Sequence, residues 1–311
     1  MKIVIVGSGG VGGFYGAKLV QAGLDVTFVA RGAHFQAMRQ HGLTIENEKG
    51  GTNLAIHNVK VTDDPLTIKS PDLIIVAVKL WDLESVAQTL KQIARPDTGV
   101  LSLQNGVIKD DILKAVFGVN SVIGGVGYVA THIGRPGVIN QVGALQKIKL
   151  GEYDGNNSAR VETLVNAFSS TGVEASSSDD IQRVLWEKYV FLVGLSALTS
   201  VTRLDIGPIR ENSGSRAVLQ SVIEEAVAVG RALRVRLPED YAGQCMALID
   251  QLPFTMSSSM YHDLSKGNRL ELPWLSGGIV SLAKKAGLPV PANAFVSDVL
   301  APYVAGRTAA A

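Results

Sequence analysis

The sequence has very little cysteine and little charge. Cys245 is the single cysteine in 311 residues, so the chain can form neither an internal disulfide nor a cysteine metal cluster. Charged residues make up 18% of the chain, and the formal net charge is +1. This balance creates no global field that would attract nucleic acid or a membrane surface, and we expect neither as a partner.

Long hydrophobic runs and histidine clusters are also missing. No apolar run reaches the roughly 18 residues that a membrane span requires, because glycine, serine and threonine interrupt the longest candidate, residues 189–201. The five histidines have no metal-ligand spacing and no catalytic triad pattern occurs, so neither a metal site nor acyl-transfer chemistry is expected. The first apolar run follows Met1 and Lys2 directly, which leaves no room for a signal peptide. We therefore expect a cytoplasmic protein.

The chain begins with a predicted strand, a glycine turn and a helix. The unbroken apolar run Ile3–Val6 is typical of a strand covered on both faces. Gly7-x-Gly9-x-x-Gly12 follows at once, before a predicted helix over residues 11–22. In a dinucleotide-binding unit such glycines permit a tight turn, close approach of the pyrophosphate and packing of helix on strand, although a merely tight turn is the alternative. The residues predicted to bind the cofactor here are Gly7, Ser8, Gly9, Gly10, Val11 and Gly12.

The end of the second predicted strand, Asp25–Ala30, indicates which cofactor is bound. A carboxylate at this position bonds the ribose 2′-hydroxyl of NAD, whereas an arginine accommodates the 2′-phosphate of NADP. The sequence has Arg31 there and no acidic residue. Because a guanidinium can bind a phosphate through two hydrogen bonds, the sequence predicts NADPH as the cofactor. A solvated loop arginine is the alternative.

Two further polar residues stand at predicted strand ends. Lys79 ends the strand predicted over residues 72–79, and Asn105 ends the strand predicted over residues 99–105. Ligands of open α/β sheets bind at the carboxyl ends of the strands, so both residues are predicted to lie at the ligand site. A solvated lysine and an ordinary Asn-Gly turn are the alternatives.

The remaining pattern divides the chain into two domains. Helices, a hairpin-like region and short β runs are predicted in the first part, at residues 33–41, 43–61, 81–94, 121–150, 159–170 and 172–175. After a polar linker the periodicity becomes helical, at residues 182–201, 216–233, 241–252 and 272–286. The sequence therefore predicts an α/β fold, with an N-terminal Rossmann-type dinucleotide-binding domain at residues 1–178 and an all-α C-terminal domain at residues 179–311.

Lys188 lies near the start of a nearly uncharged predicted helix. A helix that is apolar all round is buried, and burial lowers the pKa of a lysine towards the range that is useful for proton transfer. Leu192 and Ser196 follow at helical spacing and share its face. A lysine that extends its amine into water is an equally open interpretation.

A second polar cluster contains Ser259 and Glu271. Glu271 stands shortly before Pro273, at or just before a predicted helix N-terminus, where a carboxylate is favoured electrostatically. A plain helix-start glutamate is the alternative.

Taken in order, these motifs resemble those of the ketopantoate reductase family, the 2-dehydropantoate 2-reductases. The resemblance covers essentially the whole chain. Single motifs are weak, but the ordered set is specific. The motifs are Gly7-x-Gly9-x-x-Gly12, Arg31, Val-Lys79, Leu-Gln-Asn105-Gly, Trp-x-Lys188 and Ser-Ser259-Met followed by Glu271.

The resemblance implies an active site in a cleft between a Rossmann domain and an all-α domain. It implies NADPH-dependent reduction of a 2-oxo acid to a 2-hydroxy acid, most directly ketopantoate to pantoate in pantothenate biosynthesis. By the same resemblance, Lys188 is the general acid, Glu271 contacts the nicotinamide ribose and supports catalysis, and Ser259 binds substrate. Lys79 and Asn105 lie at the cofactor and the substrate. The resemblance is compatible with assembly as a homodimer.

The chain departs from the family at three positions. By spacing from Lys188, residues that are usually asparagines are Leu192, Ser196 and Ile206 here. Loss of hydrogen-bond partners changes discrimination among substrates, although Ser196 keeps one such group for substrate binding. The alternatives are therefore a related oxidoreductase acting on a more apolar 2-oxo acid, or a non-catalytic NADPH-binding protein.

Overall fold

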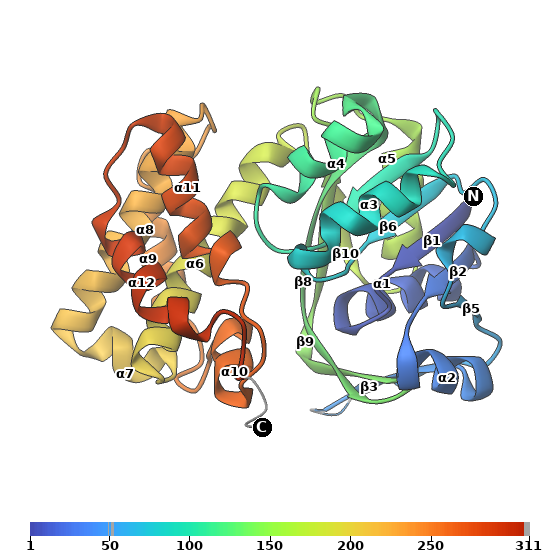
Figure 1. The fold of residues 1–311 in the computed structure, drawn as a ribbon, viewed down its shortest axis with the longest axis horizontal. Helices are drawn as coiled ribbons and strands as arrows, with labels where there is room; N and C mark the ends of the chain where they lie inside the picture. The colour runs from blue at the N-terminus through green and yellow to red at the C-terminus, as the bar shows by residue number, and fades with distance from the viewer. Residues whose placement is uncertain (49, 51–52, 308–311) are drawn as a thin grey trace. The chain divides into compact units, whose positions relative to one another are not determined.

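The computed structural model describes residues 1–48, 50 and 53–307, and the chain divides into two compact units. The units are Met1–Val184 and Leu185–Ala311, and each can be followed separately in Figure 1. Helix α6, Ile181–Thr202, contains the division, which therefore lies a few residues after the boundary predicted from the sequence. Residues 49, 51 and 52 of the predicted hairpin-like region lie outside the described residues.

The first unit contains a twisted sheet of parallel strands with the order expected of a dinucleotide-binding domain. Strand β1 lies between β6 and β2, with β7 beyond β6 and β5 beyond β2. All of these pairs are parallel, and β1 and β6 are almost completely buried, which confirms the Rossmann-type prediction. The strands are β1 (Lys2–Val6), β2 (Asp25–Val29), β5 (Lys60–Thr62), β6 (Leu73–Val76) and β7 (Gly99–Ser102).

The remaining strands extend this sheet on the β7 side. The first two residues of β8 pair with the middle of β7, and β8 then turns into β9, an antiparallel partner of the same length. β9 also pairs with β3 and β10, and β4 is the edge strand, paired with β3. The strands are β3 (Leu43–Asn47), β4 (Leu54–Ile56), β8 (Val122–Arg135), β9 (Val138–Gly151) and β10 (Glu174–Ser177). The helices of this unit are α1 (Gly10–Gln21), α2 (Gly32–His41), α3 (Leu83–Lys91), α4 (Lys109–Phe117) and α5 (Ala159–Ser169).

The prediction of several short β runs over residues 121–150 was wrong. The structure has two strands of 14 residues each. The glycines of β8 do not end strands. A Cβ atom at Gly125 would overlap Leu101, and one at Gly127 would come within 2.8 Å of the Tyr15 ring. These glycines therefore provide room for large core side chains, which a sequence pattern cannot distinguish from turn signals.

The described part of the second unit has helices joined by loops and no strand, which confirms the all-α prediction. Beyond α6 its helices are α7 (Ile206–Glu211), α8 (Ser213–Ala232), α9 (Tyr241–Asp250), α10 (Ser259–Lys266), α11 (Ser276–Ala286) and α12 (Pro291–Leu300). The short helices α7 and α10 and the proline-started α12 were not predicted. The helix predicted over residues 272–286 is interrupted, because a 3-10 turn, η4 (Leu272–Trp274), ends at Leu275, whose backbone (φ −101°, ψ −107°) is not helical.

Helix α6 is the central helix of this group. It has 22 residues, and by length and composition alone it could cross a membrane. The sequence pattern had predicted no apolar segment of that length. However, 72% of its most apolar window is buried inside the protein, as expected for a core helix. A Cβ atom at Gly194 would come within 2.7 Å of Ile223 on α8, so this glycine permits the close packing of α6 on α8.

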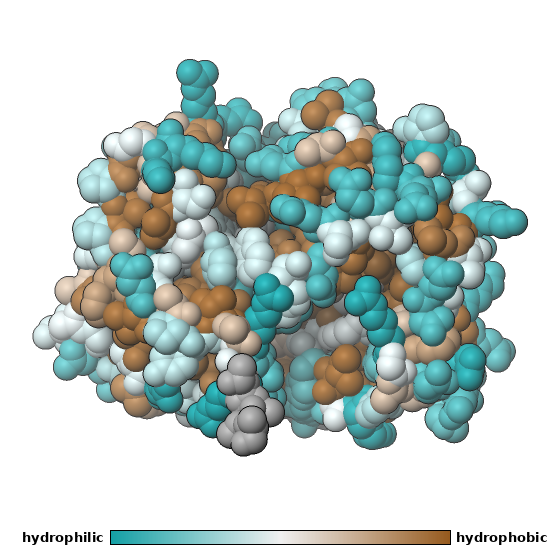
Figure 2. Space-filling model, viewed as in Figure 1, coloured by the Kyte–Doolittle hydropathy of each residue, from teal (hydrophilic) through white to brown (hydrophobic). Residues whose placement is uncertain are grey.

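The second unit exposes several large hydrophobic side chains. In Figure 2, hydrophobic side chains alternate with hydrophilic ones over the visible face of each unit. The second unit exposes Phe254, Phe295 and Val299, each by more than 40%. Phe295 and Val299 lie one turn apart on the same face of α12, whereas Phe254 lies between α9 and α10.

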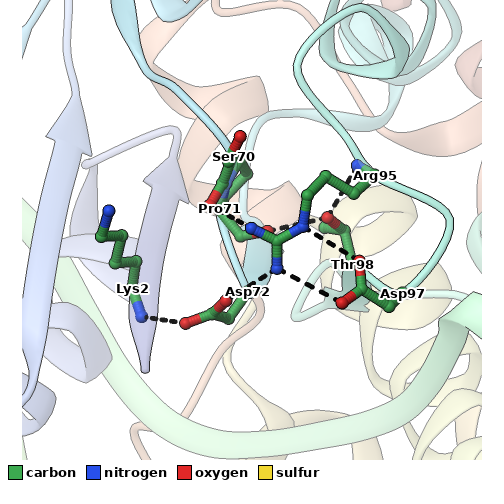
Figure 3. Close-up of polar contacts among 7 residues, drawn as sticks. All are labelled: Lys2, Ser70, Pro71, Asp72, Arg95, Asp97 and Thr98. Carbon is green, nitrogen blue, oxygen red and sulfur yellow. Dashed lines mark hydrogen bonds and ion pairs between the residues drawn. The ribbon is translucent and has the colours of Figure 1, made fainter.

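A polar network fixes the amino ends of three strands in the first unit (Figure 3). The Arg95 guanidinium donates to the Ser70 carbonyl (2.9 Å), to Asp72 (2.9 Å) and to Asp97 (3.0 Å). The Lys2 backbone N–H donates to the other Asp72 oxygen at 2.7 Å. The network therefore connects the residues that begin β1, β6 and β7, at the opposite end of the sheet from the strand ends where ligands are expected.

We predict that Asp72 makes stability depend on acid pH. The Lys2 backbone N–H and then Arg95 hold the pKa of Asp72 below its usual value. Its contribution is therefore complete above the unfolded pKa of about 3.9 and is lost as the pH falls through the lower folded value. Asp72→Asn should lower Tm at pH 7 by up to about 4 °C, because an exposed ion pair contributes little.

The measurement is Tm against pH for wild type, Asp72→Asn and the exposed control Asp63→Asn. The Asp72→Asn difference should shrink below about pH 4, and the control should follow wild type. An Asp72→Asn difference that stays constant from pH 7 to pH 2 would contradict the assignment.

Candidate active site

The glycine turn between β1 and α1 is shaped by its neighbours. Gly7 has φ +92°, and a Cβ atom there would lie 2.6 Å from the Val78 nitrogen. A Cβ atom at Gly12 would overlap the Gly7 carbonyl oxygen. The fold itself therefore requires glycine at positions 7 and 12, as the sequence analysis expected for the tight turn and for helix packing.

Gly9 differs from these two glycines. Its φ of −74° is accessible to any residue, and the nearest atom to a Cβ there would be Ile133 Cδ1 at 4.0 Å. Gly9 is the N-cap of α1, which has no side-chain cap and no acidic residue in its first turn, so backbone N–H groups are left for an anion. No residue that the structure describes requires glycine at this position. The open space above it fits a pyrophosphate that approaches the backbone.

Ser8 is held from two sides. Its hydroxyl donates to the Val29 carbonyl at 2.9 Å, and its carbonyl oxygen lies 2.9 Å from Nε2 of His34. Nδ1 of His34 accepts the Gly137 N–H at 3.1 Å, so Nε2 carries the proton and donates to Ser8. Burial lowers the pKa of His34, which favours this neutral ring. This role of His34 could not be predicted from the sequence, since nothing local indicates the contact with Gly137.

Arg31 lies where the sequence analysis placed it, just beyond β2. It is the N-cap of α2 and is exposed. Within the part of the chain that the structure describes, its guanidinium makes no hydrogen bond or ion pair. A charged group that is exposed and has no protein partner is suited to binding an anionic group of a ligand.

Lys79 and Asn105 lie on neighbouring loops. β6 ends at Val76, so Lys79 is not in the strand but is the exposed N-cap of a 3-10 turn, η2 (Leu80–Asp82). Its Nζ lies 5.5 Å from the centre of the Trp81 ring. Asn105 is half-buried in the bend after β7. Because β6 and β7 lie on one side of β1 and β2 lies on the other, these two residues and Arg31 flank the glycine turn from opposite sides.

The second unit carries the other predicted residues. Lys188, Leu192 and Ser196 recur on one face of α6. Lys188 and Leu192 are half-buried and Ser196 is 2% exposed. Ile206 does not join them, because α6 ends at Thr202 and Ile206 begins α7 with a fully buried side chain. Its N–H donates to the Met256 carbonyl at 2.8 Å, so Ile206 belongs to the core rather than to an open pocket wall.

Ser259 and its neighbour differ in environment. Ser259 is the exposed first residue of α10. Ser258 is buried and caps this helix by accepting the Tyr261 N–H at 3.1 Å. Thr199 on α6 donates its hydroxyl proton to the Leu195 carbonyl, so the 2.8 Å contact between Ser258 and Thr199 is a donation from Ser258. Ser258, which the sequence analysis did not single out, thus fastens the start of α10 to α6.

Glu271 is half-buried and is the N-cap of the 3-10 turn η4, not of an α-helix. The next α-helix, α11, begins at Ser276. Among the described residues, no group of three or more histidine, cysteine, aspartate or glutamate side chains could hold a metal ion. The predicted residues offer a lysine, a carboxylate and hydroxyl groups in the second unit, and in the first unit the glycine turn of residues 7–12, here called the dinucleotide cradle.

Comparisons with known proteins match both units. A family model described as Ketopantoate reductase PanE/ApbA matches residues 3–155, and one described as Ketopantoate reductase PanE/ApbA C terminal matches residues 180–304. A 2-dehydropantoate 2-reductase of Pyrococcus horikoshii is 30% identical over 295 residues, covering 94% of each chain.

Two other proteins extend the comparison. YkpB of Bacillus subtilis, described as an uncharacterized oxidoreductase, is 28% identical over 291 residues, which cover 94% of this chain and 95% of that protein. The crystal structure of a PanE/ApbA family ketopantoate reductase from Ralstonia eutropha JMP134 aligns with a TM-score of 0.87 and 32% identity. That alignment covers 97% of this chain and 98% of the other.

We predict that Gly9→Ala weakens dinucleotide binding without unfolding the protein. The added methyl group causes no clash, because its nearest described neighbour is Ile133 Cδ1 at 4.0 Å, but it occupies the space that a pyrophosphate would need. The Kd for NADPH should rise more than tenfold, which corresponds to about 1.4 kcal/mol. Alanine is a poorer N-cap than glycine, so Tm should fall by no more than about 4 °C.

Calorimetric titration with NADPH and thermal unfolding are the two measurements. Gly214→Ala, an exposed helix glycine of the second unit, is the matched control and should leave Kd unchanged. Gly7→Ala should lose stability instead, because its Cβ has no space. An unaltered Kd for NADPH in a folded Gly9→Ala variant would contradict pyrophosphate binding above Gly9.

Proposed function

The chain belongs to the ketopantoate reductase family of oxidoreductases, and we propose that it uses NADPH to reduce a 2-oxo acid to a 2-hydroxy acid. The observation that carries this proposal is the open space above Gly9 at the start of α1, with the exposed Arg31 beyond the neighbouring strand. Relatives named 2-dehydropantoate 2-reductase support ketopantoate as the first substrate to test. We further propose a cytoplasmic role in pantothenate biosynthesis, and assembly as a homodimer stays open.

The first unit would hold the cofactor. The N–H groups around residues 7–12 would bind the pyrophosphate, and Arg31 would bind the 2′-phosphate. Lys79 and Asn105, on the other side of the glycine turn, would serve the nicotinamide half and the substrate. When bound, NADPH supplies the hydride that reduces the substrate ketone.

The second unit would supply the proton. Lys188 donates a proton to the substrate oxygen as negative charge develops there, and its ammonium group stabilises that charge. α6 supports this role because it is a rigid, largely buried helix, so the half-buried lysine is presented from a fixed backbone. Glu271 orients the lysine and the cofactor ribose, and Ser259, Asn105 and Ser196 bind the substrate.

A more apolar 2-oxo acid is the second candidate substrate. Leu192 lies one turn beyond Lys188 and is half-buried, so it presents a hydrocarbon surface on the face of the proposed proton donor. Such a surface leaves a substrate hydroxyl without a partner, which costs about 1–3 kcal/mol. The ratio of kcat/KM for ketopantoate to that for its analogue without the hydroxyl distinguishes the two candidates.

We predict that Arg31→Asp reverses the preference between cofactors. A carboxylate repels the 2′-phosphate of NADPH and can accept a hydrogen bond from the 2′-hydroxyl of NADH. The Kd for NADPH should rise more than tenfold, or about 1.4 kcal/mol, while the Kd for NADH stays level or falls. Arg39→Asp, an exposed arginine on the same helix, controls for the change in charge. An equal loss of affinity for NADPH and NADH would show that Arg31 does not recognise the 2′-phosphate.

We predict that Lys188→Ala lowers kcat by roughly 10²–10⁴-fold, the usual contribution of a positioned proton donor. Affinity for NADPH should persist, since the lysine lies outside the dinucleotide cradle. The comparison uses steady-state kinetics and NADPH titration of wild type, Lys188→Ala and the exposed control Lys284→Ala. A near-normal kcat for Lys188→Ala would contradict the proton-donor role and favour a lysine that extends its amine into water.

A further inference from the structure

The side chain of Gln104 connects the two loops that carry Lys79 and Asn105. Its Nε2 donates to the Val78 carbonyl at 2.7 Å, and its Oε1 accepts the Ser102 hydroxyl proton at 2.9 Å. Val78 immediately precedes Lys79, and Gln104 immediately precedes Asn105. One amide group therefore joins the chain after β6 to the chain after β7.

Val78 is itself fixed against the glycine turn. A Cβ atom at Gly7 would lie 2.6 Å from the Val78 nitrogen and 2.7 Å from the Ala77 carbonyl carbon. The Ala77 N–H donates to the Val6 carbonyl at 2.8 Å. The carbonyl that Gln104 binds thus belongs to backbone that already packs on the pyrophosphate cradle, and Gln104 extends this fixed geometry to Asn105.

The other end of the connection is anchored by a buried charge. Lys109 is fully buried, and its ammonium donates to the Ser102 carbonyl at 2.8 Å and pairs with Asp110 at 3.2 Å. Asp110 also accepts the Tyr153 hydroxyl proton at 2.6 Å. A charged donor makes a stronger hydrogen bond than a neutral one, so Ser102 is held firmly where its hydroxyl reaches Gln104.

We propose that Gln104 is a positioning residue, whose amide sets the separation of Lys79 from Asn105 and so aligns the nicotinamide half of the cofactor with the substrate. This inference rests on the proposed function. An amide is needed because it donates to Val78 and accepts from Ser102 at the same time. A carboxylate would place two acceptors opposite each other, and a thioether would make neither hydrogen bond.

The test compares Gln104→Met, Gln104→Glu and wild type, with the exposed glutamine variant Gln92→Met as control. Both Gln104 variants should weaken NADPH binding. They should lower kcat about 10–100-fold, because a small misplacement of reacting groups has effects of this size. The control ligand is 2′,5′-adenosine diphosphate, which lacks the nicotinamide half. Its affinity should change by no more than about twofold, since Arg31 lies on the other side of the glycine turn from Gln104.

A double-mutant cycle with Ser102→Ala separates positioning from general loosening. If Ser102 acts through Gln104, the two effects on NADPH Kd should be strongly non-additive, whereas independent additive effects would overturn the proposal. Unchanged NADPH Kd and kcat in Gln104→Glu and Gln104→Met would also overturn it, and the Glu variant decides if the Met variant does not fold. Absence of turnover by wild type would reject the proposed function instead, and the two titrations would still test Gln104.

Discussion

The close approach of the turn after β1 to the backbone that follows β6 is the constraint on which the first unit depends. Because Gly7 has no side chain, Ala77 and Val78 can pack directly on it. This contact holds the carboxyl ends of β1 and β6 together and leaves the α1 N-terminus open above Gly9. It also fixes the Val78 carbonyl, to which the loop after β7 is joined through Gln104. A larger residue at position 7 would disturb every one of these features.

The sequence predicted those features of the fold and of the candidate site that depend on local pattern. The buried strand, the glycine turn and the position of Arg31 follow from consecutive residues, and the structure has them where they were expected. The glycines of β8 were misread because their function is to admit Leu101 and Tyr15 from elsewhere in the chain. Likewise, spacing alone placed Ile206 with the α6 residues, whereas a hydrogen bond to distant Met256 places it in the core.

The residues that the sequence analysis missed share one physical property. His34, Gln104 and Ser258 act through hydrogen bonds to groups distant in sequence or to backbone carbonyls. Such partners leave no periodic signal. Lys109 shows the same limit, since a lysine at a helix start is expected at the surface, yet here it is fully buried beside Ser102 and Asp110. The sequence could therefore suggest candidates for ligand contact, but not the residues that hold those candidates in place.

The activity proposed for this chain is the reduction of a 2-oxo acid with NADPH. The most direct measurement is the decrease of NADPH absorbance with a panel of 2-oxo acids that includes ketopantoate and its analogue without the hydroxyl. We expect multiple turnovers with at least one of these acids and lower activity when NADH replaces NADPH. Tight NADPH binding with no turnover of any 2-oxo acid would contradict it, and would identify the chain as a dinucleotide-binding protein without reductase activity.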